Sequence, residues 1–275
     1  SDLSPKELAH EGSLVELVNT LLLNDEVTKA QAIADTALFS APNQPATHLA
    51  LFECQMHTGK LTEARVSLHK AMSLKGNPDA FLMRRSRLSL REGDAAATRS
   101  LLRRRIALYP SDGFALWAYA LMSPKDSGAH DTLRADIDRA MGRLHPDRVP
   151  LDFLAAADLQ LGHEGRAKQR MSLGIKRDCD NSSQEKERSN CEAWYLAMAN
   201  ENLSRSLQLI DSALETDPFR PDFLDTKAVV LWRLGKLNLA EKAALAAVRL
   251  SPSDTYHMWQ LERIRVIRAN EDNTP

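Results

Sequence analysis

Two groups of side chains in this 275-residue chain have types and spacing that could do chemistry, and the first contains a thiol and two imidazoles. Cys54 and His57 lie three residues apart, with His48 close by, so they could bind a metal ion or form a nucleophile and base. The CxxC and HxxxH spacings of zinc sites are absent, and no catalytic base can be assigned. We therefore expect Cys54 to be a small buried hydrophobe on a helix, and we expect neither metal nor cofactor.

Two further cysteines frame a polar loop. Cys179 and Cys191 stand on either side of the stretch DNSSQEKERSN. In an oxidising compartment a disulfide between them would staple this loop, whereas in a reducing compartment they would be two unrelated thiols. The sequence leaves both alternatives open, so Cys179–Cys191 is a candidate disulfide.

Motifs of enzymes and membrane proteins are missing from the sequence. It has no G-x-x-x-x-G-K-[ST] phosphate loop, no H-E-x-x-H zinc helix and no G-x-S-x-G nucleophile elbow. No apolar run reaches 18 residues, so we expect no membrane span in this chain. The formal net charge of −1 argues against non-specific binding of nucleic acid. Because the chain starts at Ser1, we expect it to be a processed or trimmed product. The missing motifs lead us to expect that this chain is not an enzyme.

The chain is organised around a unit that is clearest at residues 223–254. Its first apolar stretch ends at Leu234–Gly235, and Pro252 prevents the second stretch from continuing as a helix. The second stretch carries small side chains at the i, i+4, i+7 spacing of one helix face: Ala240, Ala244 and Ala247. The unit is therefore predicted to be two short, closely packed helices.

The same unit recurs along the chain with a period of 34 residues. Ala247 maps to Ala213, and in the N-terminal half Ala30 maps to Ala64. With this period and its alanine and proline positions, the chain resembles tetratricopeptide repeat (TPR) proteins, although no unit carries their full W-x2-L-G-x2-Y pattern. The resemblance implies an all-α, right-handed helical-repeat solenoid of about seven two-helix units plus a C-terminal capping helix, and we expect a bacterial source.

Seven units can be assigned within a single solenoid that we place over residues 1–275. They span residues 11–44, 45–78, 79–112, 113–147, 148–186, 187–220 and 221–254. We expect a capping helix at 255–269, a disordered tail at 270–275, and a capping box at residues 4–7. The segments 123–128 and 176–189 interrupt the regular spacing, so we expect them to be the most protease-sensitive internal sites.

In the tetratricopeptide family the first helices line a concave groove that holds a peptide or a partner helix. The resemblance implies which positions of each unit point inward. The residues proposed on this basis for partner binding, with Arg91 added for its charge, are Asn19, Glu53, Met83, Arg87, Arg91, Phe114, Trp117, Tyr195 and Trp232. Aromatic rings and thioethers anchor interfaces, but the aromatic residues could instead pack between repeats. Some members of the family clamp the C-terminal carboxylate of a chaperone. We do not expect such a clamp here, because Glu53 would repel a carboxylate.

Arginines are concentrated between residues 84 and 105, where eight of them oppose only Glu92 and Asp94. Such runs usually form a solvated face whose charges pair between neighbouring repeats. The alternative is an acidic partner segment gripped by Arg87 and Arg91, because guanidinium groups hold carboxylates bidentately. RNA binding is a third interpretation, and it would require a steep salt dependence.

The function predicted is that of a non-catalytic protein–protein interaction scaffold that binds a peptide or helix of a partner, acidic or apolar, in its concave groove. The resemblance implies a role in cell-envelope assembly, secretion or polysaccharide export, in which bacterial members of the family often serve. The candidate disulfide favours the periplasm or cell envelope over the cytoplasm. The alternative is a TPR sensor or regulatory module of a larger signalling protein or enzyme. We expect no nucleic-acid partner, and the sequence predicts no oligomeric state.

Overall fold

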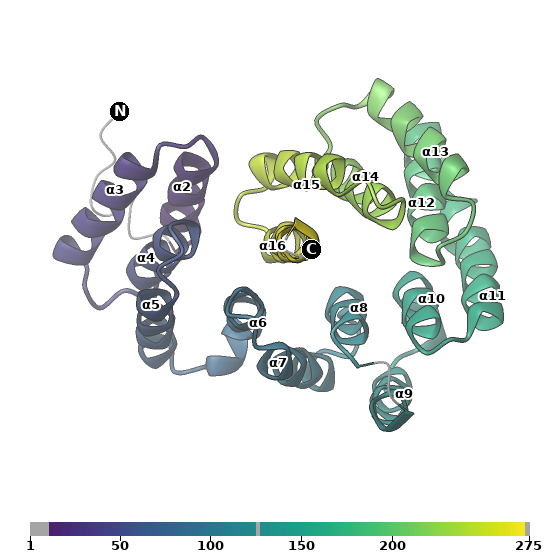
Figure 1. Ribbon diagram of the computed structural model, residues 1–275, viewed down its shortest axis with the longest axis horizontal. Coiled ribbons are helices and arrows are strands. Elements are labelled where there is room, and N and C mark those ends of the chain that lie inside the picture. Colours follow the sequence, from purple (N-terminus) through teal and green to yellow (C-terminus); the bar gives the residue numbers. More distant parts are fainter. Residues whose placement is uncertain (1–10, 125–126, 273–275) are drawn as a thin grey trace.

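The computed structural model describes residues 11–124 and 127–272, and within these ranges helices build the whole molecule (Figure 1). The described ranges contain seven consecutive helix pairs: α2 (Glu11–Leu23) with α3 (Val27–Ser40), α4 (Pro45–His57) with α5 (Leu61–Lys75), α6 (Leu82–Arg91) with α7 (Ala95–Leu108), α8 (Gly113–Leu121) with α9 (Ser127–Met141), α10 (Leu151–Gln160) with α11 (Glu164–Gly174), α12 (Glu185–Met198) with α13 (Leu203–Thr216), and α14 (Pro221–Arg233) with α15 (Leu237–Leu250). A single helix, α16 (Thr255–Asp272), follows the last pair. The predicted all-α solenoid of two-helix units with a C-terminal helix is confirmed.

A left-handed residue turns the chain back between paired helices. Outside the fourth pair, a residue with positive φ stands in each described turn: Asp25, Gly59, Gly93, Gly162, Asn200 and Gly235. Glycine adopts this conformation without a steric cost, and Asp and Asn tolerate it better than other residues do. The fourth pair has its turn in the predicted interruption at 123–128, of which residues 125–126 lie outside the described residues.

Small side chains on the second helices set how closely the pairs stack. One such residue is fully buried on most second helices, in register from repeat to repeat: Ala30, Ala64, Thr98, Ala167, Ser206 and Ala240. In the fourth pair Leu133 is the fully buried residue, one position later than the 34-residue period places it. The regular alanines of the sequence therefore mark the stacking surface of the solenoid.

The solenoid turns far enough for its last pair to meet its first (Figure 1). Arg249 of α15 donates a hydrogen bond to the carbonyl oxygen of Leu23, with 3.0 Å between Nη2 and O. Asn19 of α2 donates from Nδ2 to the carbonyl oxygen of Pro252 at 2.7 Å. The solenoid is therefore a ring, closed by contacts between its first and last helix pairs. Its concave face is the inside of this ring.

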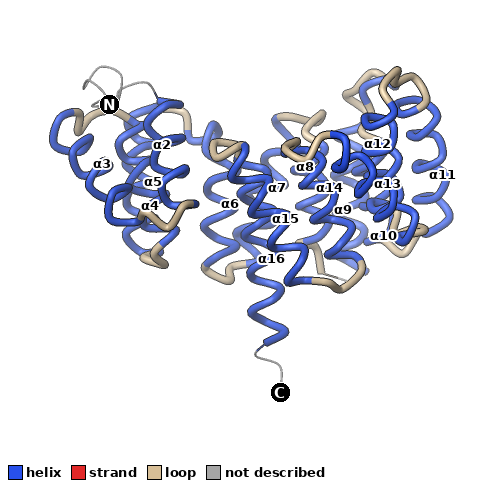
Figure 2. The backbone as a smooth tube through the Cα atoms, turned by 90° about the horizontal axis from the view of Figure 1, so that it is seen from above, coloured by secondary structure: helices blue, strands red, loops and turns tan. Residues whose placement is uncertain are grey.

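The C-terminal helix α16 runs through the middle of this ring (Figure 1), and its final turns project beyond the other helices (Figure 2). The six consecutive residues from Trp259 to Ile264 are each no more than 7% exposed. Six residues cover every face of an α-helix, so protein surrounds this part of α16 on all sides. α16 does cap the last repeat, because Leu261 and Ile264 pack against Ala244 of α15, but its other faces meet the opposite wall of the ring.

We expected disorder from residue 270 onward, and this is wrong for residues 270–272, which α16 includes. Arg265 and Arg268 both bind Glu241 of α15, and these ion pairs hold the last turns of the helix in place. Residues 273–275 and the predicted capping box at residues 4–7 lie outside the described residues.

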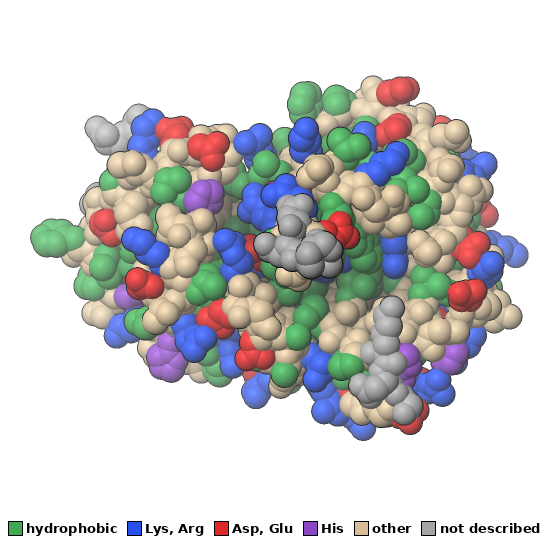
Figure 3. Space-filling view, viewed as in Figure 1, with side chains coloured by type: hydrophobic (Ala, Val, Ile, Leu, Met, Phe, Trp, Pro, Cys, Tyr) green, Lys and Arg blue, Asp and Glu red, His purple; other side chains and the backbone are tan. Residues whose placement is uncertain are grey.

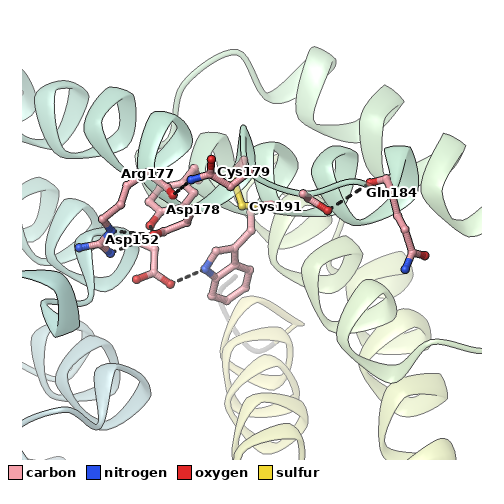
Figure 4. Close-up of a disulfide and its surroundings, with 10 residues drawn as sticks. Asp152, Arg177, Asp178, Cys179, Gln184 and Cys191 are labelled. Carbon is pink, nitrogen blue, oxygen red and sulfur yellow. Dashed lines mark hydrogen bonds and ion pairs between the residues drawn. A yellow bond between two sulfur atoms is a disulfide. The ribbon is translucent and has the colours of Figure 1, made fainter.

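A disulfide joins Cys179 to Cys191, whose Cα atoms are 5.5 Å apart (Figure 4). It links the π-helical turn Ile175–Cys179 to α12, so part of the predicted loop at 176–189 is helical. Gly174 opens this turn and lets the Tyr195 ring lie against the backbone, since an added Cβ would stand 2.1 Å from Cε1 of the ring. The inserted residues therefore form an ordered element that the disulfide fastens to the next repeat.

Candidate functional site

The nine residues proposed for partner binding all lie in the described part of the chain, and most are covered. Six are buried, each no more than 6% exposed: Asn19, Glu53, Met83, Arg87, Trp117 and Tyr195. Three are half-buried: Arg91, Phe114 and Trp232. Asn19, Glu53, Arg87 and Arg91 line a cleft that stays open on the concave face. The chain's own α16 lies along the rest of this face.

The N-terminal wall of the ring, formed by α2, α4 and α6, meets α16 through polar and charged groups. Arg91 of α6 binds Glu262 of α16, with 2.8 Å between Nη1 and Oε1. One turn earlier, Arg87 binds Glu53 of α4, and both side chains are almost fully buried. Arg87 Nη1 also lies 3.1 Å from the Sδ atom of Met258. The grip on carboxylates that we proposed for Arg87 and Arg91 therefore exists within the molecule.

The C-terminal wall, formed by α8, α10, α12 and α14, meets α16 through aromatic rings. Ring centroids in this cluster lie between 4.8 and 6.3 Å apart, mostly in edge-to-face arrangement. The rings are those of Phe114, Trp117, Phe153, Trp194 and Trp232 on the wall and Tyr256 and Trp259 on α16. The hydroxyl of Tyr256 donates to Asp112 at 2.8 Å. Packing between repeats, the alternative that we left open for the tryptophans, therefore describes their present contacts.

Tyr195 does not belong to this cluster, and its assignment to the groove is wrong. Its ring packs on Gly174 and its hydroxyl donates a hydrogen bond to Asp178. The preceding residue, Trp194, faces the concave side, with its ring 6.1 Å from that of Trp117 and its Nε1 donating to Asp152 at 2.7 Å (Figure 4). The insertion before α12 shifts the register, so the counted position falls one residue too late.

Between α16 and the C-terminal wall, some buried polar atoms have no hydrogen-bond partner among the described residues. They are Nε1 of Trp117, Nε1 of Trp259, Nε2 of Gln260, Nη2 of Arg263 and Oδ1 of Asp225. The Arg263 guanidinium stacks 3.9 Å from the centre of the Trp232 ring, and burial lowers its pKa to about 9. Burial raises the pKa of Asp225 to about 6, although His257 and Arg263 nearby act to lower this pKa.

On the side of the N-terminal wall, the concave face stays open beside α16 as a cleft of about 740 Å³. In Figure 3 Lys and Arg side chains gather near the middle of the face in view. The apolar residues of the cleft include Leu22, Leu23, Met56, Leu90, Leu261 and Val266. Its charged or titratable residues include His57, Arg91, Arg265, Arg268, Glu241 and Glu262. The cleft therefore combines an apolar surface with several arginine–carboxylate pairs.

The charges of the cleft are arranged so that two arginines share one carboxylate. Arg265 and Arg268 both bind Glu241, and the distance from Arg265 Nε to Oε1 is 3.0 Å. Burial, and then the nearby charges of Arg265 and Arg91, lower the pKa of His57, so its imidazole is neutral at pH 7. A carboxylate that enters the cleft would find guanidinium donors already positioned.

Outside the cleft, the arginine run pairs with acids of its own or neighbouring repeats, as the first interpretation predicted. Arg103 binds Asp136 at 2.6 Å, Arg104 binds Asp79 at 2.7 Å and Arg105 binds Asp112 at 2.7 Å. These pairs lie at least partly at the surface, where each contributes little to stability. They leave this stretch less positive than its arginine count implies.

Cys54 is fully buried, and burial raises the pKa of its thiol to about 12, which confirms it as a small buried hydrophobe. Nearby, His48 Nε2 lies 2.8 Å from the carbonyl oxygen of Pro42. Residues 11–124 and 127–272 contain no group of three or more His, Cys, Asp or Glu side chains placed to hold a metal ion. Among the described helices, none has the length and apolar character needed to cross a membrane.

No protein-family model and no curated protein matches the chain. Among solved structures, a tetratricopeptide repeat protein from Parabacteroides merdae is 14% identical, with a TM-score of 0.45 over 93% of this chain and 98% of that one. The Cut9–Hcn1 hetero-tetramer of APC/C is 14% identical with a TM-score of 0.43 and 89% of this chain covered, and this chain spans 47% of the length of that chain. A human IFIT1 dimer with m7Gppp-AAAA is 15% identical, with a TM-score of 0.36 over 94% of this chain and 66% of that one.

These likenesses concern the fold alone, and the helices of this chain carry the argument themselves. Helix pairs recur every 34 residues in the regular repeats, a left-handed residue turns most of them, and small buried side chains stack them. The chain has the fold of a tetratricopeptide repeat solenoid.

Proposed function

We propose that this chain is a non-catalytic interaction scaffold that binds a peptide or helix of a partner protein on its concave face, beginning at the cleft beside α16. The cleft is the observation that carries the proposal. Its volume of about 740 Å³ lies in the range of about 300–1,000 Å³ that is usual for ligand sites, and three successive first helices line it. Repeat solenoids characteristically use such extended concave surfaces for binding.

The lining of the cleft fits a segment with both apolar and acidic side chains. Leu23 offers apolar contact area on the ring side, and Val266 offers it on α16. Arg265 and Arg268 share Glu241, so an incoming carboxylate would complete their pairing. We therefore propose a partner segment in which one or two carboxylates accompany apolar anchors.

We place this function in cell-envelope assembly, secretion or polysaccharide export. The support is the disulfide between Cys179 and Cys191, because such bonds persist in oxidising compartments and are rare in the cytosol. The disulfide supports only the compartment. The identity of a crosslinked partner will decide among the three roles.

Site-specific photo-crosslinking in the native host tests the proposal. A photoreactive residue at His57, on the edge of the cleft, is compared with the same residue at Val66, which is 67% exposed on α5 and lies outside the cleft. We expect a discrete crosslinked protein from the His57 chain and none from the Val66 chain. Equal crosslinking at both positions, or crosslinking only at Val66, would contradict the proposed site.

A further inference from the structure

We propose that α16 is an exchangeable occupant of the concave face, and that the partner is a helix with the chemistry of α16 that binds by displacing it. The partner helix would carry a large aromatic residue followed three positions later by a carboxylate, as Trp259 is followed by Glu262. This inference rests on the proposed function and deepens it, because it names the kind of segment that the concave face accepts.

The composition of α16 is the first reason to regard it as exchangeable. Its central six residues are surrounded by protein, yet three of them, Gln260, Glu262 and Arg263, are polar. A helix that is buried on all sides as a permanent part of a core is normally apolar all round. The sequence of α16 therefore resembles a segment that also spends time in water.

The unpaired polar atoms around α16 are the second reason. Gln260 Nε2, Arg263 Nη2 and Trp259 Nε1 are buried on α16 without a hydrogen-bond partner in the described structure, and so is Trp117 Nε1 on the facing wall. Each buried donor without an acceptor opposes docking, because water satisfies it when α16 is released. A partner helix that supplies acceptors at these places would bind the same surface better than α16 does.

The residues that contact α16 specify the chemistry of a helix that could replace it. On one wall Arg91 holds the Glu262 carboxylate at 2.8 Å. On the other wall Phe114 packs edge-on against the Trp259 ring, with the ring centroids 5.6 Å apart. Residues three apart lie on neighbouring parts of a helix surface. Any helix with this pair can therefore present its aromatic ring to Phe114 and its carboxylate to Arg91. An aromatic anchor and a charge pair together select for such a helix.

The surroundings of α16 provide a route for exchange. The cleft of about 740 Å³ lies along the face that carries Leu261 and Arg265, so an incoming helix can begin to bind before α16 has left. The C-terminal end of α16 is exposed from Ala269 to Glu271 and projects from the ring (Figure 2). Peeling would begin at this exposed end, while Ser251–Asp254 keeps the displaced helix attached to α15.

The test uses the full chain and a fluorescein-labelled synthetic peptide that copies residues 254–272. Glu262→Ala weakens the internal occupant, so we expect this chain to bind the peptide about fivefold more tightly than the wild-type chain does. Adding Arg91→Glu should weaken peptide binding at least tenfold, because repulsion replaces attraction, and a peptide with Glu262→Arg should restore it to this doubly substituted chain. Arg104→Glu added to the Glu262→Ala chain is the matched control, because Arg104 lies on the outer helix α7, and it should leave peptide affinity unchanged.

Hydrogen exchange on the wild-type chain gives a readout that does not depend on the folding of any variant. We expect the amides of α16 to exchange at least tenfold faster than those of α14, because α16 is released while the ring persists. Equal protection of α16 and α14, together with no peptide binding to a folded Glu262→Ala chain, would overturn the proposal and make α16 a permanent core helix.

These outcomes separate the inference from the function on which it rests. A partner that crosslinks at His57 while α16 stays fully protected leaves the scaffold function standing and overturns the exchange. Peptide exchange without any crosslinked partner at His57 supports the exchange and contradicts the proposed cleft.

Discussion

The two walls that enclose α16 hold it by different means. The N-terminal wall offers arginines, contacts α16 through the ion pair between Arg91 and Glu262, and leaves a cleft of about 740 Å³ beside it. The C-terminal wall offers aromatic rings that pack on Tyr256 and Trp259 with centroids 4.8 and 5.6 Å apart. Aromatic burial supplies far more stability than a partly exposed ion pair. The C-terminal wall should therefore anchor the helix, and the N-terminal wall should select and admit ligands.

The largest effect is expected on the aromatic side. Trp117 is fully buried and contacts rings from three other helices, so Trp117→Ala should lower the free energy of unfolding by about 3–5 kcal/mol. Urea denaturation followed by circular dichroism measures this change. Phe39→Ala is the control, because Phe39 is 92% exposed and its truncation should change stability by less than about 0.5 kcal/mol. A loss below about 1 kcal/mol for Trp117→Ala would show that this wall is not the anchor.

The disulfide should be the next largest contribution, and it lies on the same side of the molecule. It closes a loop with a sequence separation of 12, so replacing both Cys179 and Cys191 by serine should cost about 2–3 kcal/mol. Hydrogen exchange should rise in α11 and α12 and stay unchanged in α2 to α5. Reductant should destabilise the wild-type chain and leave the doubly substituted chain unaffected, and equal loosening of both halves would contradict the assignment.

Asp225 tests whether the C-terminal wall carries an unfavourable charge. Its pKa is raised from 3.8 to about 6, so the folded chain holds this proton more tightly than the unfolded chain between about pH 4 and pH 6. The contribution of this group to stability is therefore fully present below pH 4 and falls as the pH rises to 6. Asp225→Asn should then stabilise the chain by about 1–3 kcal/mol at pH 7.5, and the gain should vanish near pH 4.

Thermal melts of the wild-type and Asp225→Asn chains across this pH range measure the effect. His257 and Arg263 on α16 face Asp225, together with Asp254 and Asp222. If Asp225→Asn lowers the melting temperature at pH 7.5, attraction to His257 and Arg263 outweighs burial, and this wall holds α16 partly by charge.

The smallest effect is expected from the ion pair on the N-terminal wall. In a double-mutant cycle, the coupling between Arg91→Ala and Glu262→Ala should be about 1 kcal/mol, because Glu262 is only 9% exposed at its side chain. The more exposed pair of Arg104 and Asp79 should show a coupling below about 0.5 kcal/mol. Coupling of about 3 kcal/mol or more at Arg91 and Glu262 would reverse the order of the two walls.

Short-range patterns made most of the solenoid predictable from sequence. Ala30, Ala64 and Ala240 recur in register because each second helix needs a small residue where the next helix packs, and Gly59 and Gly235 recur because each turn needs a left-handed residue. The pairing of Glu53 with Arg87 was also within reach, since the two residues are 34 apart and so hold the same position in adjacent repeats.

The contents of the concave face were not predictable by the same reasoning. The contact of Arg91 with Glu262 joins residues 171 apart, and it depends on how far the solenoid turns, which no repeat encodes by itself. The choice of Tyr195 instead of Trp194 failed for a local reason, because the insertion closed by Cys179 and Cys191 changes the register at α12. Three buried polar residues in α16 were the available signal that this helix is more than a cap.

The central claim is that α16 fills the concave face, and tryptophan fluorescence tests it most directly. All four tryptophans of the chain lie in the aromatic cluster around α16: Trp117, Trp194, Trp232 and Trp259. With α16 in place, the native chain should show blue-shifted emission and weak quenching by acrylamide. Red-shifted emission with strong quenching in the native chain would contradict the account, because it would mean that the concave face is open to water.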